Sequence, residues 1–180
     1  MRKKRVILYV YVLFCLSGTT AQTYYYDTTK TFNENGYTYQ CDIKAERVTL
    51  YNKVNQFTYA QQTYKDGGYV DFDHWDDVAD LQSNTGTTSL AYSIVNNAFS
   101  AAEKSRVSGE SLSIAIIISP ETGKIIEVYF TFRTKSKYAT IPVSVYREIE
   151  TELKCQIWFT PTEEGKKVNY LMRGWRQEVK

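Results

Sequence analysis

The stretch LSIAIIISPETGKIIEVYFTF, residues 112–132, decides the fold. Its apolar residues alternate on both sides of a central turn, at Leu112, Ile114, Ile116 and Ile118 and then at Ile126, Val128, Phe130 and Phe132. Period-two alternation predicts β-strands, and PETG at 120–123 has the composition of a tight turn, so the stretch predicts a β-hairpin. Ala115 and Ile117, on the other face of the first strand, are apolar too, which indicates a central strand.

Apolar residues at helical spacing lie on both sides of this hairpin. Before it, such residues recur at Leu90, Ile94, Ala98 and Ala101, which predicts a helix from Ser89 to near Gly109. After it, Pro142 suits a first helical turn, and the spacing of Ile141, Val145, Ile149 and Leu153 predicts a second helix. Three acidic residues of this second helix are expected to face water: Glu148, Glu150 and Glu152.

The remaining stretches complete an α+β pattern. Five of them predict strands: 36–43, 48–54, 57–64, 155–160 and 166–179. The last of these strands is expected to place Val168, Tyr170 and Met172 inward. Residues 22–35 are polar and predict a loose arm or an edge strand. We therefore expect a mainly antiparallel sheet with two helices on one face, in the order helix, hairpin, helix, strand, strand, extended by N-terminal strands.

The N-terminus has the pattern of an export signal. Four basic residues at positions 2–5 precede an apolar run at 6–16, and Thr19-Thr20-Ala21 provides small residues for cleavage. The run is shorter than the ~20 residues that a membrane span needs. Cys15 would suit a lipoprotein, but Phe14 stands where a lipobox requires a small residue. We expect residues 1–21 to be removed, leaving 22–180 as a single exported domain, periplasmic or secreted, with no membrane span.

Removal of the signal would change the sign of the net charge. The chain has 22 basic and 20 acidic residues, and loss of the four basic residues at positions 2–5 leaves 18 basic against 20 acidic, a net charge of about −2. The basic residues that remain are dispersed, so nucleic acid is not an expected partner.

The C-terminal half carries motifs of a known family. These are Gly109, the segment GKIIEV at 123–128, a helix at 143–153, WFTP at 158–161 and GKKV at 165–168. In this order they resemble the TonB C-terminal domain over residues 88–180, preceded by N-terminal strands and an acidic loop at 22–87. The chain lacks the Tyr-Pro pair of that family's first helix, a retained anchor and a proline-rich spacer, so the resemblance implies a fold and no energy transduction. The chain from 22 onward also resembles uncharacterised exported domains of Gram-negative bacteria.

Cys41 and Cys155 remain after removal of the signal. In an oxidising compartment an even pair can form a disulfide, here closing a loop of 115 residues, which the chain-entropy model values at ~5 kcal/mol. The alternative is two buried thiols, because free cysteine packs as a small hydrophobe.

An acidic segment is the densest polar cluster, with Asp71, Asp73, Asp76 and Asp77 around the sole histidine, His74. Its oxygen ligands could bind Ca²⁺, but the spacing lacks the central glycine and closing glutamate of an EF-hand. A solvated loop is the simpler interpretation. A single histidine cannot supply the ligands of a zinc site. A serine or cysteine nucleophile needs a base, and His74 is the only imidazole in the chain. No cofactor motif is present. We therefore expect no enzyme, no metal and no cofactor.

The aromatic residues are the remaining functional signal. Tyr24, Tyr25 and Tyr26 stand at the new N-terminus, and such rings suit protein or sugar partners, although they also suit half-buried strands. We expect an exported, non-catalytic binding or structural protein of the bacterial envelope that acts by protein–protein contact through a sheet edge. The alternatives are a carbohydrate-binding accessory protein and, third, a hydrolase with a dispersed carboxylate site.

Overall fold

A six-stranded antiparallel sheet organises the molecule. The computed structural model describes residues 23–70, 81–83 and 86–180. The order across the sheet is β1-β2-β3-β6-β5-β8. The strands are β1 Lys30–Glu34, β2 Tyr37–Lys44, β3 Arg47–Asn52, β5 Ser111–Ile118, β6 Ile125–Arg133 and β8 Leu171–Glu178. A separate two-stranded ribbon joins β4, Leu81–Ser83, to β7, Phe159–Pro161.

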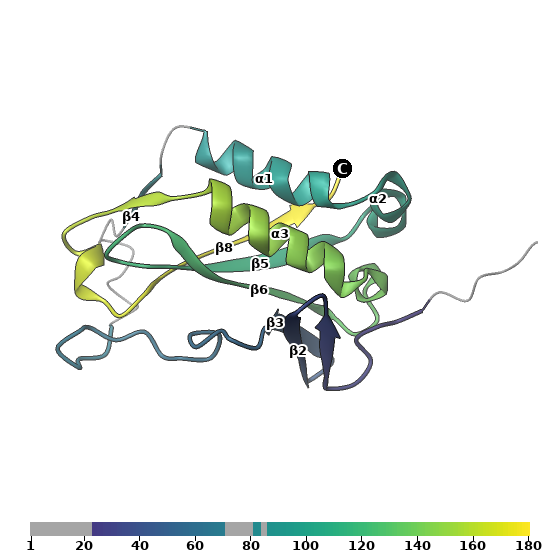
Figure 1. Ribbon diagram of the computed structural model, residues 1–180, viewed down its shortest axis with the longest axis horizontal. Helices are drawn as coiled ribbons and strands as arrows, with labels where there is room; N and C mark the ends of the chain where they lie inside the picture. Colours follow the sequence, from purple (N-terminus) through teal and green to yellow (C-terminus); the bar gives the residue numbers. More distant parts are fainter. Residues whose placement is uncertain (1–22, 71–80, 84–85) are drawn as a thin grey trace, which may run out of the picture.

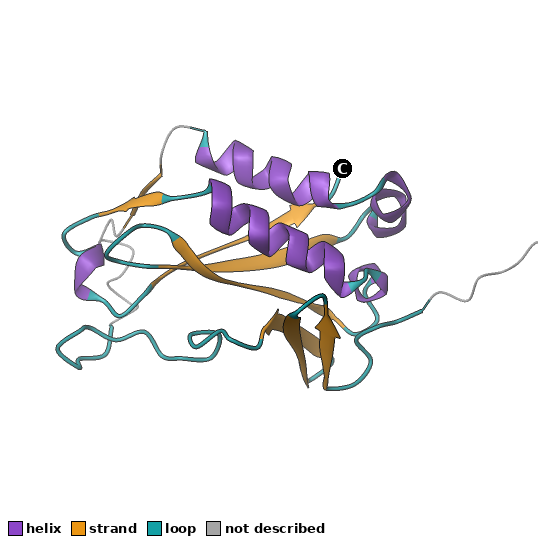
Figure 2. Cartoon of the chain, in the orientation of Figure 1, coloured by secondary structure: helices purple, strands orange, loops and turns teal. Residues whose placement is uncertain are grey.

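Three α-helices pack on the sheet, which confirms the α+β class (Figure 1). They are α1 Thr87–Ala98, α2 Ala101–Val107 and α3 Val143–Gln156, with short 3-10 turns η2 at Lys137–Thr140 and η3 at Gly165–Lys167. Figure 2 shows α1 and α3 side by side across one face of the sheet. None of the helices among the described residues has both the length and the apolar composition that a membrane span requires.

The predicted hairpin forms β5 and β6 at the centre of the sheet. Ile114 pairs with Phe130, and Ile116 pairs with Val128, all four side chains being buried under the helices. The register shifts between Ile117 and Ile118, so Ile125 is buried, whereas Ile126, which the alternation grouped with the buried Val128 and Phe130, is exposed. A β-bulge inserts one extra residue into a strand, so the residues beyond it change the face on which their side chains lie. A regular alternation in the sequence does not reveal this change.

The first predicted helix is two helices. Helix α1 ends at Ala98, and Ser100 caps α2: its hydroxyl accepts from the amide of Glu103, whose carboxylate accepts from the amide of Ser100. This reciprocal capping box satisfies two amide donors that a helix start leaves open. The apolar period continues through the break, which is why it predicts a single helix. The structure therefore has three helices where we expected two.

Two other expectations about strands are wrong. Residues 57–64 form no strand and contribute only isolated bridges, Thr63 to Tyr69 and Tyr64 to Val168. The stretch 155–160 begins as the last turn of α3 and only then becomes β7. On the last strand Val168 and Tyr170 are buried as predicted, but Met172 is exposed and its neighbour Leu171 is buried. The strand begins only at Leu171, after η3, so the alternation does not run through from Val168.

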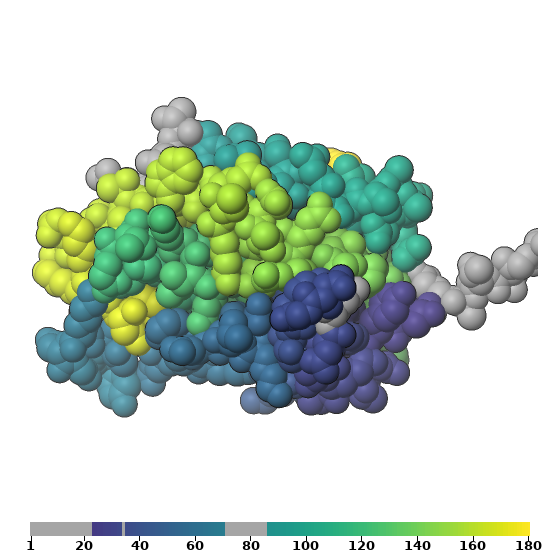
Figure 3. All heavy atoms as spheres, viewed as in Figure 1, coloured from purple at the N-terminus to yellow at the C-terminus, as the bar shows by residue number. Residues whose placement is uncertain are grey.

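An irregular segment, residues 53–70, is fastened to the sheet by carboxylates. Both oxygens of the buried Glu127 accept hydrogen bonds from backbone amides, at 2.5 Å from Gln56 and 3.0 Å from Phe57. Asp42 on β2 accepts from the hydroxyls of Tyr51, at 2.8 Å, and Tyr59, at 3.0 Å. Figure 3 shows this segment, in blue, packed along the lower side of the molecule.

The hydrogen bonds to Asp42 predict a pH dependence of stability. Burial by itself would raise the pKa of Asp42, but hydrogen bonds from Tyr51, Gln40 and Tyr59 outweigh it and lower the pKa below 3.8. The folded pKa is therefore below the unfolded one, so this stabilisation is present above about pH 4 and is lost as the pH falls through the folded pKa.

Asp42→Asn should therefore cost about 0.5–1 kcal/mol at pH 6, because the carboxylate is only partly buried, and progressively less below pH 4. Urea denaturation of both proteins at pH 3 and pH 6 measures the difference. A constant gap at the two pH values would contradict this assignment.

Candidate functional site

Strand β8 is one edge of the sheet. It pairs with β5 from Leu171 opposite Ile118 to Glu178 opposite Ser111, and within the described part no strand pairs with its other side. An edge of eight residues presents a row of backbone donors and acceptors that another chain can use.

An apolar pocket lies beside this edge, between the two long helices. Its volume is about 160 Å³, and its lining comes from α1, α3, the sheet and β7: Thr87, Thr88, Ala91, Tyr92, Ile116, Ile125, Leu153, Ile157, Phe159, Arg173 and Trp175. The rings of Tyr92 and Trp175 stack with centroids 6.4 Å apart. An apolar cavity of about 150 Å³ is large enough to hold a benzene molecule, so the pocket suits one apolar side chain.

The pocket and the edge are parts of one surface because β8 contributes to both. Arg173 and Trp175 are two residues apart and project to the same face of the sheet, where they reach the pocket. Gln177, next on that face, donates from its side chain to the carbonyl of Tyr92, at 2.8 Å, and fixes β8 to α1. We call β8 and this pocket together the edge site.

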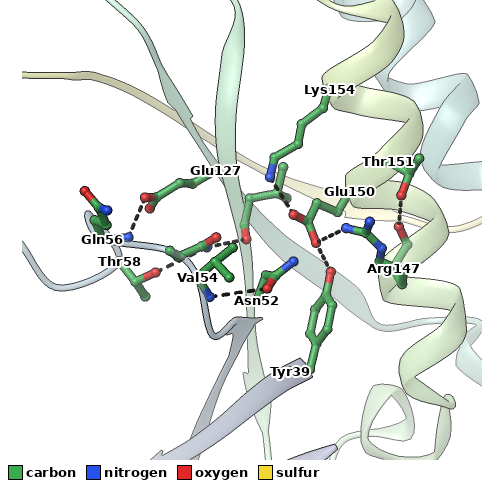
Figure 4. A network of polar contacts seen from close by, with 12 residues as sticks. Tyr39, Asn52, Val54, Gln56, Thr58, Glu127, Arg147, Glu150, Thr151 and Lys154 are labelled. Atoms are coloured by element: carbon green, nitrogen blue, oxygen red, sulfur yellow. Dashed lines mark hydrogen bonds and ion pairs between the residues drawn. The ribbon is translucent and has the colours of Figure 1, made fainter. Parts of the chain in front are cut away.

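Apart from the edge site, a polar cluster lies between β2 and α3. Glu150, expected to face water, is fully buried. It accepts a hydrogen bond from the hydroxyl of Tyr39 and forms ion pairs with Arg147, at 3.2 Å, and with Lys154, at 2.6 Å (Figure 4). Burial and the Glu150 charge raise the pKa of Tyr39 far above its usual value, so its hydroxyl stays protonated and donates. Arg147 also lies over the ring of Tyr37, 4.8 Å from its centroid.

This cluster is a structural connection. Every charge in it is engaged by the chain itself, and none of its residues lines a pocket described above. The sequence offered no signal of it, because the partners of Glu150 come from a strand about 110 residues away as well as from its own helix.

The predicted aromatic residues are mostly part of the core. Tyr26 is fully buried among Phe32, Phe132 and Tyr146, and its hydroxyl donates to the carbonyl of Ile141, at 2.9 Å. Tyr25 is half-buried and donates its backbone amide to Ala139, while Tyr24 alone of the three is exposed. Tyr25 and Tyr26 thus fasten the N-terminal segment, and a binding role for Tyr26 is excluded by its burial.

The two cysteines are free thiols in the structure, so the disulfide that the sequence left possible is not formed. Cys41 is buried on β2 and Cys155 is exposed on α3, so the alternative of two buried thiols holds for Cys41 only. The spacing along the chain carried no information on whether the two side chains meet.

Because Cys41 is buried and Cys155 is exposed, the two thiols should differ in reactivity. Burial raises the pKa of Cys41 to about 11, which suppresses its thiolate, whereas Cys155 is open to solvent. We expect Ellman's reagent at pH 8 to label one thiol rapidly in the folded chain that begins at Gln22, and both in urea. Cys155→Ser should abolish the rapid phase. Two rapid equivalents in the folded protein would contradict the buried position of Cys41.

The acidic residues Asp71, Asp73, Asp76 and Asp77, with His74, lie outside the described residues. In the part of the chain that is described, no group of three or more His, Cys, Asp or Glu side chains could hold a metal ion.

Fold and edge site together define a class: an α+β protein with an open antiparallel edge beside an apolar pocket. Family comparison is more specific. Residues 22–175 match the model of DUF5043, a domain of unknown function, so the chain belongs to the DUF5043 family. A solved structure of a DUF5043 family protein from Bacteroides uniformis is similar, with 42% identity and a TM-score of 0.83 over 88% of this chain and 89% of the other. No curated protein matches the chain.

Proposed function

We propose that this protein binds an extended segment of a partner protein, which adds as a further strand to β8. The observation that carries the proposal is the edge site, an unpaired strand edge that runs alongside an apolar pocket. In strand addition, backbone hydrogen bonds give affinity, and pockets for alternate side chains give specificity. The edge site provides both.

The other edge of the sheet is less suited to this role. Strand β1 has only five residues, against eight in β8, and its first residue is a charged lysine that is paired with Asp27. Short edges with lysine are a common way in which sheets avoid unwanted pairing. The favoured partner segment is therefore one that lies along β8.

The pocket selects the chemistry of that segment. Arg173 and Trp175 face the pocket from alternate positions of β8, so alternate residues of an added strand would face it as well. A pocket of about 160 Å³ fits one aromatic or large aliphatic side chain. We expect the bound segment to carry such a residue flanked by polar ones.

The location proposed for this binding is the bacterial envelope or the exterior. It rests on the export pattern of residues 1–21.

The likeness of residues 88–180 to the TonB C-terminal domain remains a prediction, and the order of two helices, hairpin, helix and strand supports it.

Extended peptides test the proposal. A random library of ten-residue peptides, selected on the chain from Gln22, should yield sequences with one aromatic or large aliphatic residue. N-methylation of a selected peptide at alternate residues should abolish binding in one register and leave it intact in the other, because only alternate amides face the edge strand. Equal tolerance of both registers, or no selected peptide, would overturn strand addition.

A matched pair of variants tests the pocket. Thr88 is exposed at the pocket, and its neighbour Ser89 is exposed on the same turn of α1 but does not line it. Thr88→Trp should lower the affinity for a selected peptide more than tenfold, because the larger side chain would occupy the pocket. Ser89→Trp should leave that affinity unchanged. Equal effects would place the peptide elsewhere.

The alternatives have different support. Carbohydrate binding is supported by a separate surface, the face of the sheet opposite the helices. A hydrolase lacks comparable support. The described residues include two buried glutamates, Glu127 and Glu150, and donors of the chain itself engage both carboxylates.

A further inference from the structure

The face of the sheet opposite the helices is partly open. Residues on this face alternate with the buried core positions, and two rows cross the sheet. In one row Thr49 is opposite Thr131, Thr131 is opposite Ser113, and Ser113 is opposite Arg176. In the next row Arg47 lies opposite Arg133.

Four cationic side chains gather at this place. They line a hollow of about 740 Å³ and are all exposed: Arg47, Arg133, Lys135 and Arg176. None of the four forms an ion pair within the described part of the chain. The lining includes one carboxylate, Glu110, which is engaged by the hydroxyl of Ser136 and the amide of Lys137. The hollow therefore carries a net positive charge of about three.

The cross-strand pair Arg47 and Arg133 is unfavourable for folding. Like charges directly opposite each other on neighbouring strands destabilise a sheet. Thr49, Thr131 and Ser113 on this face are uncharged, and Asp42, opposite Thr49, accepts hydrogen bonds from Tyr51 and Tyr59 and forms no ion pair with either arginine. Two arginines opposite each other, neither of which forms an ion pair within the described residues, are an arrangement that an anionic ligand completes.

Hydroxyl groups and an aromatic ring adjoin the cations. Ser111, Ser113 and Thr131 make no side-chain hydrogen bond within the described residues. A second hollow, of about 390 Å³, shares Ser113, Thr131 and Arg176 with the first and is lined by Tyr129 and Gly174. We call these two adjoining hollows the basic face.

We propose that the basic face binds an acidic saccharide, a sugar chain that carries carboxylate or sulfate groups. The arginine forks bind such anions through paired N–H donors. The free hydroxyls exchange hydrogen bonds with sugar hydroxyls, and the ring of Tyr129, which lines the second hollow together with Gly174, provides an apolar surface for a sugar ring. Nucleic acid is disfavoured, because the chain from Gln22 has a net charge of about −2 and four cations form a small patch.

Binding to two polymers tests this proposal and identifies the anion. Heparin supplies sulfate groups, polygalacturonate supplies carboxylates, and dextran is the neutral control; all are titrated calorimetrically against the chain from Gln22 at 150 mM NaCl. We expect binding to heparin, polygalacturonate or both, and none to dextran. Binding to heparin alone assigns sulfate, and binding to polygalacturonate alone assigns carboxylate. No binding to either polymer, or tighter binding to a DNA oligonucleotide, would overturn the proposal.

A double variant separates the basic face from general electrostatics. Arg47→Gln with Arg133→Gln should weaken binding at least tenfold while leaving the melting temperature unchanged or raised, because cross-strand repulsion is relieved. The control, Lys166→Gln with Lys167→Gln, makes the same change in net charge on η3 and should leave binding unchanged. Equal losses in the two double variants would overturn the assignment to the basic face.

Discussion

Replacing Gly123 with alanine is expected to lower the free energy of unfolding by about 2–4 kcal/mol. Gly123 closes the β5–β6 turn with φ +70°, a conformation that L-residues adopt only with strain. A Cβ at this position would lie 1.9 Å from the carbonyl oxygen of Phe159 and 2.9 Å from its carbonyl carbon. Both obstacles are backbone atoms, so the chain itself would have to move.

The displacement would reach beyond the turn. The carbonyl of Gly123 accepts from the amide of Phe159 at 2.9 Å, and Lys124 forms a bridge with Trp158. A methyl group between these segments would separate the central hairpin from β7, and with it from the ribbon that β7 forms with β4. The loss therefore exceeds that of an ordinary glycine in a turn.

Urea denaturation of Gly123→Ala and Gly36→Ala separates the two causes of this loss. Gly36 also has a positive φ, +81°, but a Cβ there would meet nothing within 4 Å. Gly36→Ala should cost about 1 kcal/mol, the strain alone. A loss at Gly123 no larger than the loss at Gly36 would show that β7 does not lie as closely against the turn as described.

Glu150→Ala should cost about 2–4 kcal/mol. The substitution leaves the hydroxyl of Tyr39 buried without an acceptor and removes the shared partner of Arg147 and Lys154. Arg147 and Lys154 are partly exposed and can be hydrated, so the loss should stay near the low end of the range for a broken buried ion pair.

A double-mutant cycle measures the connection between β2 and α3. Tyr39→Phe and Glu150→Ala, alone and combined, should show a coupling energy of about 1–2 kcal/mol, because each removes the partner of the other. The matched control is Glu148→Ala on the exposed side of α3, with an expected loss within about 0.5 kcal/mol. Additive losses at Tyr39 and Glu150 would refute the hydrogen bond between them.

Most of the C-terminal half could be predicted from local pattern. The β5–β6 hairpin and the helix around Val145 and Ile149 carry strong periodicity, and they occur where it predicts them. Such patterns reflect burial on one face of an element, which is a property of nearby residues. The split at Ser100 was missed although its signal, a serine followed three residues later by glutamate, stands in the sequence.

The errors have a different origin, since each depends on residues far apart. Residues 57–64 contain the spaced aromatics of a strand, but backbone amides of the segment 53–70 donate to Glu127. The ring of Tyr59 packs against Tyr51 on β3, and the ring of Phe57 packs against Tyr170. The polar composition of residues 22–35 predicts a loose arm or an edge strand, but Tyr26 in this stretch is buried and its hydroxyl donates to the carbonyl of Ile141. The edge site escaped prediction because pairing order decides which strand ends the sheet.

By itself, the sequence determined the α+β class, the central hairpin and the helical faces, because apolar periodicity is local and sets which side of each element avoids water. Only the tertiary structure decided that β8 is an edge beside a pocket, that Glu150 is buried, and that Arg47 meets Arg133 across two strands. These features arise from pairings between distant segments, whose partners no single stretch encodes.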